Sequence, residues 1–358
     1  LFIEKCKDLL AHPEKILQLV KNETLELAEK FGDDRRTDIV SDEVEEINIE
    51  DLIKEEDMVI LISRLGYIKS VPVTAYKNQG KGGKGSNSAK LVEDDYIKQL
   101  FVASTHDYIV FISTEGKAYW IKVHEIPEAG RASRGSHIKS LLAIGANEEI
   151  ATVVSLREFS EEHHLFMATA NGVIKKVKTA DFKNAKTRGI IAINLDAGDK
   201  IVSAILTGGS DDLALASRRG KVLRITETSV RPMGRSSRGV SGLKLAVGDE
   251  LTAAVRVDTN ANMLLLTESG YGKRVDFDQF SVHSRGTQGQ IGYNVNDKTG
   301  EVVGVIAVAG TDEVMCITSQ GKTLKLEASA ISRQGRTSQG VCILKIDAPD
   351  FVIGVDRV

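Results

Sequence analysis

The stretch Leu213-Ala-Leu-Ala-Ser-Arg-Arg-Gly220 decides the fold, because the chain contains six versions of it. Each version is an apolar run followed by Ser or Thr, two further residues and a glycine. These turn glycines are Gly66, Gly116, Gly172, Gly220, Gly270 and Gly321, and they are 50, 56, 48, 50 and 51 residues apart. An aliphatic strand that ends at a glycine predicts a hairpin whose turn glycine has a positive φ.

A second repeated element, here called the box, follows each turn glycine. Its last glycine lies 19 residues after the turn glycine in five repeats and 17 residues after it in the third. Boxes 1 to 6 are Gly80–Gly85, Arg131–Gly135, Lys186–Gly189, Gly234–Gly239, Arg285–Gly289 and Gly335–Gly340. A repeat of about 50 residues with about four strands is typical of a propeller blade. The sequence therefore predicts an all-β, six-bladed propeller-like domain at residues 58–358, closed as a disc or open as a spiral.

Two other segments precede the repeats. Residues 1–32 place apolar residues at helical spacing, with Pro13 suited to a first turn and Gly32 to a C-cap, and predict a short helical segment. Residues 33–57 are acidic and are interpreted as a linker. Residues 1–57 carry 8 Lys/Arg and 18 Asp/Glu, whereas residues 58–358 carry 39 and 32, a net charge of +7. A mildly basic body permits binding to nucleic acid.

The composition argues against several classes of protein. Cys6, Cys316 and Cys342 are few and far apart, as expected for a reduced, cytoplasmic protein without disulfides or a zinc site. The sequence has no apolar run near the roughly 20 residues of a membrane span. Ser86 follows Gly85 where a nucleotide-binding P-loop requires Lys. We expect no catalytic residue, metal ligand or cofactor in this chain.

Basic side chains recur at equivalent positions of the repeat. One set lies three or four residues after the turn glycine: Lys69, Lys175, Lys176, Arg224, Lys273, Arg274 and Lys325. The second repeat has Tyr119 and Trp120 there instead. The other set lies in the boxes: Arg131, Arg134, Lys186, Arg188, Arg235, Arg238, Arg285 and Arg336. Superposed repeats would arrange these cations as an arc on the rim of the disc, which could neutralise phosphates and hold a bent duplex without reading its sequence.

Box 1 carries a resemblance to a known family. With the preceding residue it reads Gln79-Gly80-Lys81-Gly82-Gly83-Lys84-Gly85. This resembles the seven-residue box of DNA gyrase A subunits, whose pattern is Gln, two basic residues and Gly-Gly-Lys-Gly. Gly80 departs from the pattern, because it replaces a basic residue. The segments 32–37, 49–57 and 66–69 also resemble gyrase, so that the similarity covers essentially the whole chain.

The resemblance implies a fold and a function. In the gyrase family this domain is a β-pinwheel, a propeller-like disc whose neighbouring blades exchange strands. It binds double-stranded DNA and wraps it with positive handedness, and so presents a segment for strand passage while the holoenzyme introduces negative supercoils with ATP. The seven-residue gyrase box is implied to join the first and last blades and to be needed for wrapping.

The resemblance also places the chain within a larger enzyme. Residues 1–32 are implied to be the tail of the coiled-coil and breakage-reunion region, and the catalytic tyrosine lies outside this chain. The chain is therefore implied to be a non-catalytic part of an ATP-dependent type II topoisomerase, an isomerase. The implied partners are the gyrase B protein and the rest of the gyrase A protein, in an A2B2 holoenzyme that uses ATP and Mg. The chain by itself is expected to be a monomer.

Two alternatives stay open at the level of sequence. One is the corresponding domain of topoisomerase IV, which has a degenerate box and less regular blades. The retained Gly-Gly-Lys-Gly and the six regular repeats count against this alternative. The other is a propeller scaffold whose rim cations bind acidic protein partners, and salt-dependent DNA binding would be absent from such a scaffold.

Overall fold

The computed structural model describes residues 2–33, 49–63, 65–75, 95, 97–130, 133–146, 148–320 and 323–357. The gyrase-like box Gln79–Gly85, Arg131, Gly321 and most of the expected linker lie outside these described residues. The chain divides into two compact units, Leu1–Ile49 and Glu50–Val358.

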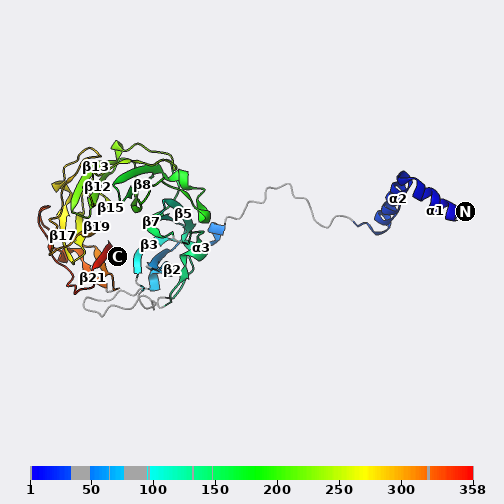
Figure 1. Cartoon of the computed structure of the whole chain (residues 1–358). Coiled ribbons are helices and arrows are strands. Elements are labelled where there is room, and N and C mark those ends of the chain that lie inside the picture. The colour runs from blue at the N-terminus through cyan, green and yellow to red at the C-terminus, as the bar shows by residue number, and fades with distance from the viewer. Residues whose placement is uncertain are drawn as a thin grey trace. The chain divides into compact units, whose positions relative to one another are not determined.

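The first unit contains two helices, α1 (Phe2–Ala11) and α2 (Pro13–Phe31) (Figure 1). Pro13 begins α2, where the N–H that proline lacks would have no partner within the helix. No side chain in the described part of these helices is buried, and apolar side chains such as Leu17 and Val20 are exposed. The short helical segment predicted at the start of the chain is confirmed. No helix among the described residues is long and apolar enough to cross a membrane.

The second unit consists of six antiparallel sheets, or blades, arranged in a ring (Figure 1). Each blade contains three long strands. They are β1 (Asp57–Ser63), β2 (Tyr67–Pro72) and β3 (Ile97–Ser104) in blade 1; β4 (Tyr108–Ser113), β5 (Lys117–Lys122) and β7 (Ile150–Leu156) in blade 2; β8 (His164–Thr169), β9 (Val173–Lys178) and β11 (Ile201–Thr207) in blade 3; β12 (Asp212–Ser217), β13 (Lys221–Thr226) and β15 (Leu251–Arg256) in blade 4; β16 (Asn262–Thr267), β17 (Tyr271–Asp276) and β19 (Val302–Val308) in blade 5; β20 (Glu313–Thr318), β21 (Thr323–Glu327) and β23 (Val352–Arg357) in blade 6. The predicted six-bladed all-β fold is confirmed.

In each described hairpin, the repeated Ser or Thr and the turn glycine form the turn between the first two long strands of the blade. Gly66, Gly116, Gly172, Gly220 and Gly270 have φ values of 82°, 83°, 79°, 77° and 80°, as the sequence predicts. The hydroxyl oxygens of Ser63, Ser113 and Ser217 accept the backbone N–H four residues later at 3.1, 3.1 and 3.2 Å. These hydroxyls are buried, so the hydrogen bond within the turn satisfies a polar group that water cannot reach.

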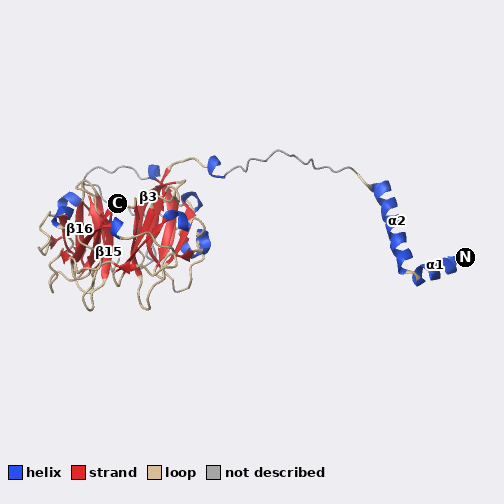
Figure 2. Ribbon diagram, turned by 90° about the horizontal axis from the view of Figure 1, so that it is seen from above, coloured by secondary structure: helices blue, strands red, loops and turns tan. Residues whose placement is uncertain are grey.

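The third long strand of each blade lines the centre of the ring. β7 contacts β11, β11 contacts β15, β15 contacts β19, and β19 contacts β23. The last of these strands, β23, contacts β3 of blade 1. The blades therefore close into a disc, which Figure 2 shows from its side.

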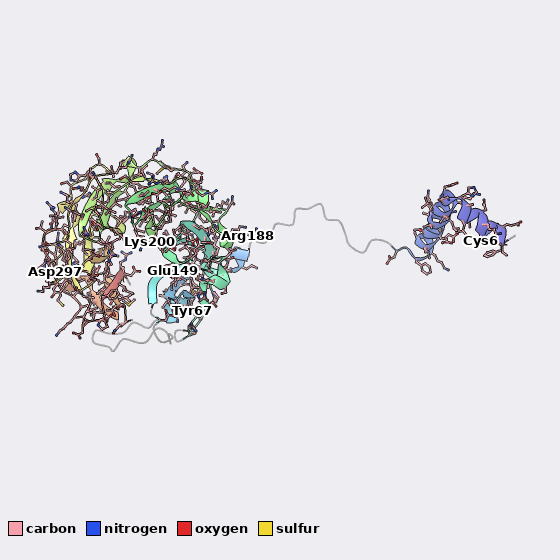
Figure 3. All side chains as sticks on the ribbon, in the orientation of Figure 1. Cys6, Tyr67, Glu149, Arg188, Lys200 and Asp297 are labelled. Carbon is pink, nitrogen blue, oxygen red and sulfur yellow. The ribbon has the colours of Figure 1, made fainter. Side chains whose placement is uncertain are left out.

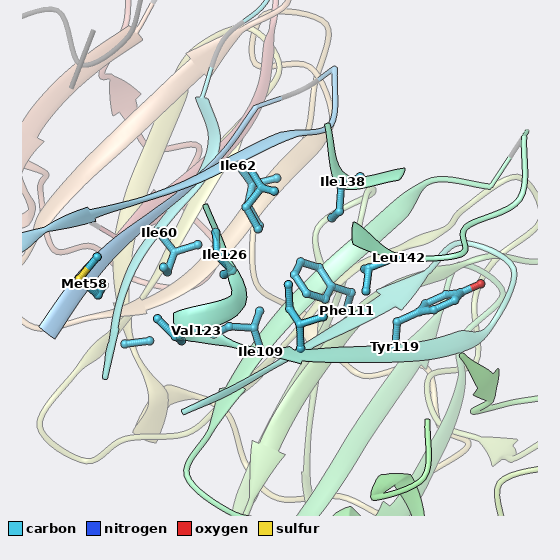
Figure 4. Packing of buried hydrophobic residues seen from close by; sticks show 13 residues of the cluster. Met58, Ile60, Ile62, Ile109, Phe111, Tyr119, Val123, Ile126, Ile138 and Leu142 are labelled. Atoms are coloured by element: carbon cyan, nitrogen blue, oxygen red, sulfur yellow. The ribbon is translucent and has the colours of Figure 1, made fainter. Parts of the chain in front are cut away.

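The apolar core lies between the faces of neighbouring blades. Ile60 of β1 and Phe111 of β4 are fully buried in one cluster between blades 1 and 2 (Figure 4). Phe166 of β8 and Leu215 of β12 belong to the equivalent cluster between blades 3 and 4. Because both faces of a blade are covered, its strands are nearly continuous apolar runs, which is why the repeat is visible in the sequence.

A short fourth strand passes from each of blades 2 to 6 to the blade before it. β6 (Ser136–His137), β10 (Ile190–Ile191), β14 (Val240–Ser241), β18 (Gln290–Ile291) and β22 (Val341–Cys342) follow boxes 2 to 6 and pair with β2, β5, β9, β13 and β17. Neighbouring blades thus exchange strands, as the family resemblance implies. Among the described residues, blade 6 has the three strands β21, β20 and β23.

Short helical turns connect these strands. They are η2 (Val73–Ala75), η3 (Val123–Glu125), η4 (Thr179–Phe182), η6 (Glu227–Ser229), η7 (Phe277–Gln279) and η8 (Ala328–Ala330) after the second strands, η5 (Lys186–Arg188) in box 3, α3 (Ile138–Leu141) after box 2 and η1 (Ile49–Leu52) before blade 1.

The second unit begins earlier than the expected linker end at Asp57. Glu50 in η1 forms an ion pair with Lys122 at 2.5 Å, and Glu55 forms one with Arg157 at 2.7 Å. The Ile53 carbonyl lies 2.9 Å from the Nε2 of His106. These contacts attach residues 50–56 to blade 2, because the acidic side chains meet basic partners there. The sequence alone could not assign these partners.

The exchanged strand makes the last glycine of the box indispensable. Gly239 has a φ of 99°, and a Cβ atom added there would lie 2.7 Å from the Ile174 carbonyl oxygen of β9. We expect Gly239→Ala to lower the free energy of unfolding by about 1–3 kcal/mol in urea denaturation, because it combines backbone strain with this clash. Gly234→Ala is the matched control in the same box, since nothing lies within 4 Å of its added Cβ. Equal unfolding midpoints for the two variants would contradict this explanation.

Candidate nucleic-acid interface

Boxes 2 to 6 lie at the outer edge of the disc. In each four-stranded sheet, the central strand and the strand that follows a box stand at opposite ends of the strand order. Figure 3 shows Arg188 of box 3 at this edge, whereas Lys200 and Glu149 lie nearer the centre of the ring. The boxes therefore provide a surface that a long, curved ligand could follow.

Boxes 2, 4 and 6 share one turn. A serine donates its backbone N–H and its hydroxyl to the carbonyl of the glycine three residues earlier. The N–H and hydroxyl distances are 2.9 and 2.9 Å for Ser133 and Gly130, 3.1 and 2.8 Å for Ser237 and Gly234, and 3.2 and 2.9 Å for Ser338 and Gly335. In box 5 a threonine takes this place, and the Thr287 hydroxyl donates to the Ser284 carbonyl at 3.0 Å. These local bonds explain why the boxes combine glycine with Ser or Thr.

Backbone hydrogen bonds link neighbouring boxes. The carbonyl of the box Ser or Thr accepts the N–H of a residue that follows the preceding box. The donor and acceptor pairs are Ala143 and Thr187 at 2.9 Å, Asn194 and Ser237 at 3.1 Å, Lys244 and Thr287 at 2.9 Å, and Asn294 and Ser338 at 3.2 Å. Boxes 2 to 6 therefore form a connected series, here called the belt, in which the position of one turn constrains the next.

Three lysines expected on the rim are instead buried beneath the belt. Lys69, Lys175 and Lys273 are 2%, 0% and 0% exposed. Each lies on the strand that receives the next blade's exchanged strand, and its side chain faces the next box turn. Its ammonium group donates to that turn's carbonyls, so it contacts protein in place of phosphate. Burial lowers the pKa of Lys175 and Lys273 to about 8, and both groups are still mainly charged at neutral pH.

The next position of the repeat, four residues after the turn glycine, is also engaged within the protein. Lys176 is buried and lies 3.6 Å from the buried carboxylate of Glu227. Arg224 forms an ion pair with Asp212 at 2.8 Å, and Lys325 forms one with Glu313 at 2.7 Å. Arg274 donates to the Ile331 carbonyl at 2.8 Å. Lys325 alone in this set is exposed. The expectation that this set forms the rim is therefore corrected: the strand directs most of these side chains toward neighbouring loops.

The box cations do reach the surface. Arg134, Lys186, Arg188, Arg238 and Arg285 are exposed, and Arg235 and Arg336 are half-buried. Arg134 stacks on the Tyr67 ring at 3.6 Å, and Arg238 donates to Asp196 through Nε at 2.9 Å. Within the described part of the chain, no carboxylate lies within ion-pair distance of the other box cations or of Arg134. Their positive charge is available to an anionic ligand.

Sequence reasoning missed further residues of this edge. Asn194 donates its side-chain amide to the Ser236 carbonyl of box 4 at 2.5 Å, and Asp196 orients Arg238. Lys244 and Lys345 are exposed cations that both stand five residues after the last glycine of a box. This shared register is a signal that could have identified them from the sequence.

Blade 2 holds its neighbouring box without a lysine. Tyr119 occupies the equivalent position, and its ring covers Gly189 so closely that a Cβ there would overlap the ring. Its hydroxyl donates to the buried carboxylate of Glu148 at 3.1 Å, which also accepts from Lys117 at 3.1 Å. Burial alone would raise the pKa of Glu148, but hydrogen bonds, including that of the Gly145 N–H, outweigh it and hold the pKa below its usual value.

The described residues contain no cluster of three side chains suited to hold a metal ion. What the edge offers is a curved series of backbone-anchored turns, each carrying Arg or Lys. Fixed cations on such turns suit a polyanion, because they neutralise phosphates wherever the ligand is placed along the edge.

Comparisons with known proteins identify relatives of the chain. Residues 57–104, 107–157, 163–207, 211–258, 261–309 and 312–358 match the family described as DNA gyrase C-terminal domain, β-propeller. The DNA gyrase A protein of Treponema pallidum (strain Nichols) is 55% identical over 356 residues, which are 99% of this chain and 44% of that protein. That of Escherichia coli (strain K12) is 40% identical over 329 residues, 92% of this chain and 38% of that protein. The chain thus spans less than half the length of these relatives.

Solved structures show the same architecture. A structure of the DNA gyrase A C-terminal domain superposes with a TM-score of 0.72 at 32% identity, covering 84% of this chain and 99% of that one. The C-terminal domain of a DNA topoisomerase IV superposes with a TM-score of 0.71 at 22% identity, covering 86% of this chain and 94% of that one. The second likeness concerns the fold alone.

The buried Glu148 should make the free energy of unfolding depend on pH in the acidic range. Because its pKa is lowered in the folded state, its contribution is fully present above the usual carboxyl pKa and is lost as the pH falls. We expect Glu148→Gln to lower the free energy of unfolding by about 1–3 kcal/mol at pH 7. The difference from the parent should shrink as urea denaturation is repeated toward pH 3. A difference that stays constant over this range would contradict the assignment.

Proposed function

Because the chain belongs to the DNA gyrase C-terminal domain family, we propose that it binds double-stranded DNA without sequence preference along the belt and wraps it with positive handedness. The observation that supports this proposal is the recurrence of exposed cations on box turns that are bonded to one another around the outer edge. Arg188, Arg238 and Arg285 belong to three successive boxes of this series.

The chemistry of the edge suits phosphate better than bases. Short turns that carry one or two cations cannot fill a DNA groove, but their side chains and N–H groups can contact the backbone. Bending a duplex of 20–30 base pairs by 40–90° costs about 1–6 kcal/mol, which several phosphate contacts together can offset. The proposed role of the disc is thus to hold DNA in a bent path.

The wider role is proposed for the full-length protein. There the wrapped DNA is presented as a segment for strand passage, and the gyrase B protein together with the rest of the gyrase A protein completes an A2B2 holoenzyme. This enzyme would use ATP and Mg to introduce negative supercoils in the cytoplasm, with its catalytic tyrosine outside this non-catalytic, monomeric chain. Gln79–Gly85, outside the described residues, is proposed to take part in wrapping.

Salt dependence tests whether the belt contacts phosphates. Each phosphate contact contributes about −0.9 to the slope of log affinity against log salt concentration. We expect Lys186→Ala and Arg285→Ala each to reduce the magnitude of this slope by about that amount in fluorescence anisotropy with a linear duplex. Lys200→Ala is the matched control, since Lys200 is exposed but lies near the centre of the disc. An equal loss of slope in the control would refute the edge as the binding surface.

Wrapping is tested by topology. A nicked circular DNA sealed by ligase in the presence of the full chain should show a positive shift in linking number that declines with added salt. Deletion of Gln79–Gly85, or Lys81→Ala with Lys84→Ala, should diminish the shift. Binding without any shift would refute chiral wrapping. A complete lack of binding at low salt would refute the nucleic-acid function and favour a scaffold for acidic proteins.

A further inference from the structure

The buried lysines occur in every second blade. Three residues after the turn glycine, blades 1, 3 and 5 have Lys69, Lys175 and Lys273. Blades 2, 4 and 6 have Tyr119, Leu223 and Leu324 at the same position. The lysines of the odd-numbered blades face boxes 2, 4 and 6, which are the boxes that share the serine turn.

All three ammonium groups bind the same atom of their box. The carbonyl oxygen of the box serine accepts from Nζ of Lys69, Lys175 and Lys273 at 2.9, 2.9 and 2.8 Å; these serines are Ser133, Ser237 and Ser338. In boxes 4 and 6 this oxygen also accepts the N–H that links the box to the preceding one. The ammonium group therefore sits where the belt is joined.

A second carbonyl completes the arrangement in boxes 4 and 6. Lys175 also donates to the Arg235 carbonyl, and Lys273 donates to the Arg336 carbonyl at 2.8 Å. Two carbonyls that lie two residues apart and point at one ammonium group leave the residue between them on the outside. That residue is Ser236 in box 4 and Thr337 in box 6, and both are exposed.

We propose that Lys69, Lys175 and Lys273 are positioning residues of the DNA-binding edge, each holding one box turn with its hydrogen-bonded carbonyls turned inward. This inference rests on the proposed function. Carbonyl oxygens left facing the ligand would repel phosphate, and an ammonium group beneath the turn both turns them away and offsets their partial negative charge. The lysine acts through the turn and does not touch DNA.

The alternation gives the belt two kinds of box. Boxes 2, 4 and 6 are held from below by a lysine, whereas the lysine position facing boxes 3 and 5 carries Tyr119 and Leu223. In boxes 3 and 5 the serine is replaced by Thr187 and Thr287. The groups of boxes 2, 4 and 6 that would contact phosphate are accordingly held in place before DNA binds. These boxes therefore lose less conformational freedom on binding than boxes 3 and 5.

The test is Lys175→Met in the full chain, with Leu223→Met as the matched control. Both substitutions place methionine at the same position of the repeat, and both sites are 0% exposed. Thermal denaturation first establishes the temperature at which each variant is folded. Affinity for a linear duplex is then measured by fluorescence anisotropy over a series of salt concentrations, with Arg235→Ala as an example of a direct contact.

We expect Lys175→Met to bind about three- to tenfold more weakly at fixed salt, while the salt slope stays at the parent value because no phosphate contact is removed. Arg235→Ala should lower the magnitude of the slope by about 0.9, and Leu223→Met should match the parent. Parent-like affinity of a folded Lys175→Met would overturn the positioning role and leave the proposed function intact. A reduced slope in Lys175→Met would overturn it too, since the lysine would then contact DNA itself.

Failure to fold is also informative. If Lys175→Met unfolds, Lys69→Met and Lys273→Met carry the same test in the other odd-numbered blades. Unfolding of all three variants, with Leu223→Met folded, would overturn the proposal and assign these lysines to the stability of the disc alone. A parent chain that does not bind the duplex would instead refute the proposed function, and the positioning role with it.

Discussion

The outermost strand of each exchanged sheet comes from the next blade, and this exchange governs where the boxes lie. The polypeptide must leave its own blade, turn and join its neighbour within a few residues. Gly239 meets this demand with a φ of 99° and an approach to Ile174 that admits no Cβ. The turn that precedes the exchanged strand is thereby forced to the periphery, so that the same constraint that holds the blades together also exposes the box cations.

The burial of three ammonium groups is a cost that the propeller itself does not require. Moving a charge out of water is unfavourable unless it is fully hydrogen-bonded. Tyr119 and Leu223 show that an aromatic or aliphatic side chain satisfies the same position of the strand. What Lys175 and Lys273 add is a partner for carbonyls that would otherwise be buried or turned outward. Their occurrence in alternate blades is therefore better explained by the surface they shape than by stability.

Much of the fold follows from the sequence, because a period of about 50 residues and six turn glycines are enough to define the blades. The candidate site follows less completely. Lys175 and Lys176 are adjacent and leave a strand on opposite faces, yet which face meets a neighbouring blade depends on the strand exchange. The sequence does offer one signal. Where a box contains the serine, as at Ser338, the facing strand carries a lysine, Lys273. Where a box contains a threonine, as at Thr287, the facing strand carries Leu223 instead. The ion pairs of Glu50 and Glu55 depend on tertiary contacts between distant segments, for which the sequence offers no register.

A protein that bends DNA without reading it benefits from contacts that are ready before the ligand arrives. Each side chain that becomes ordered on binding costs about 0.5–1.5 kcal/mol of conformational free energy. This cost is comparable with the binding free energy that one exposed cation contributes. The bonds between successive boxes, such as Asn194 to Ser237 and Lys244 to Thr287, meet this cost during folding. Many modest contacts fixed in this way can together offset the bending energy of a stiff duplex. In the proposed function, a net charge of only +7 on residues 58–358 would be sufficient, because the arrangement of the cations matters more than their number.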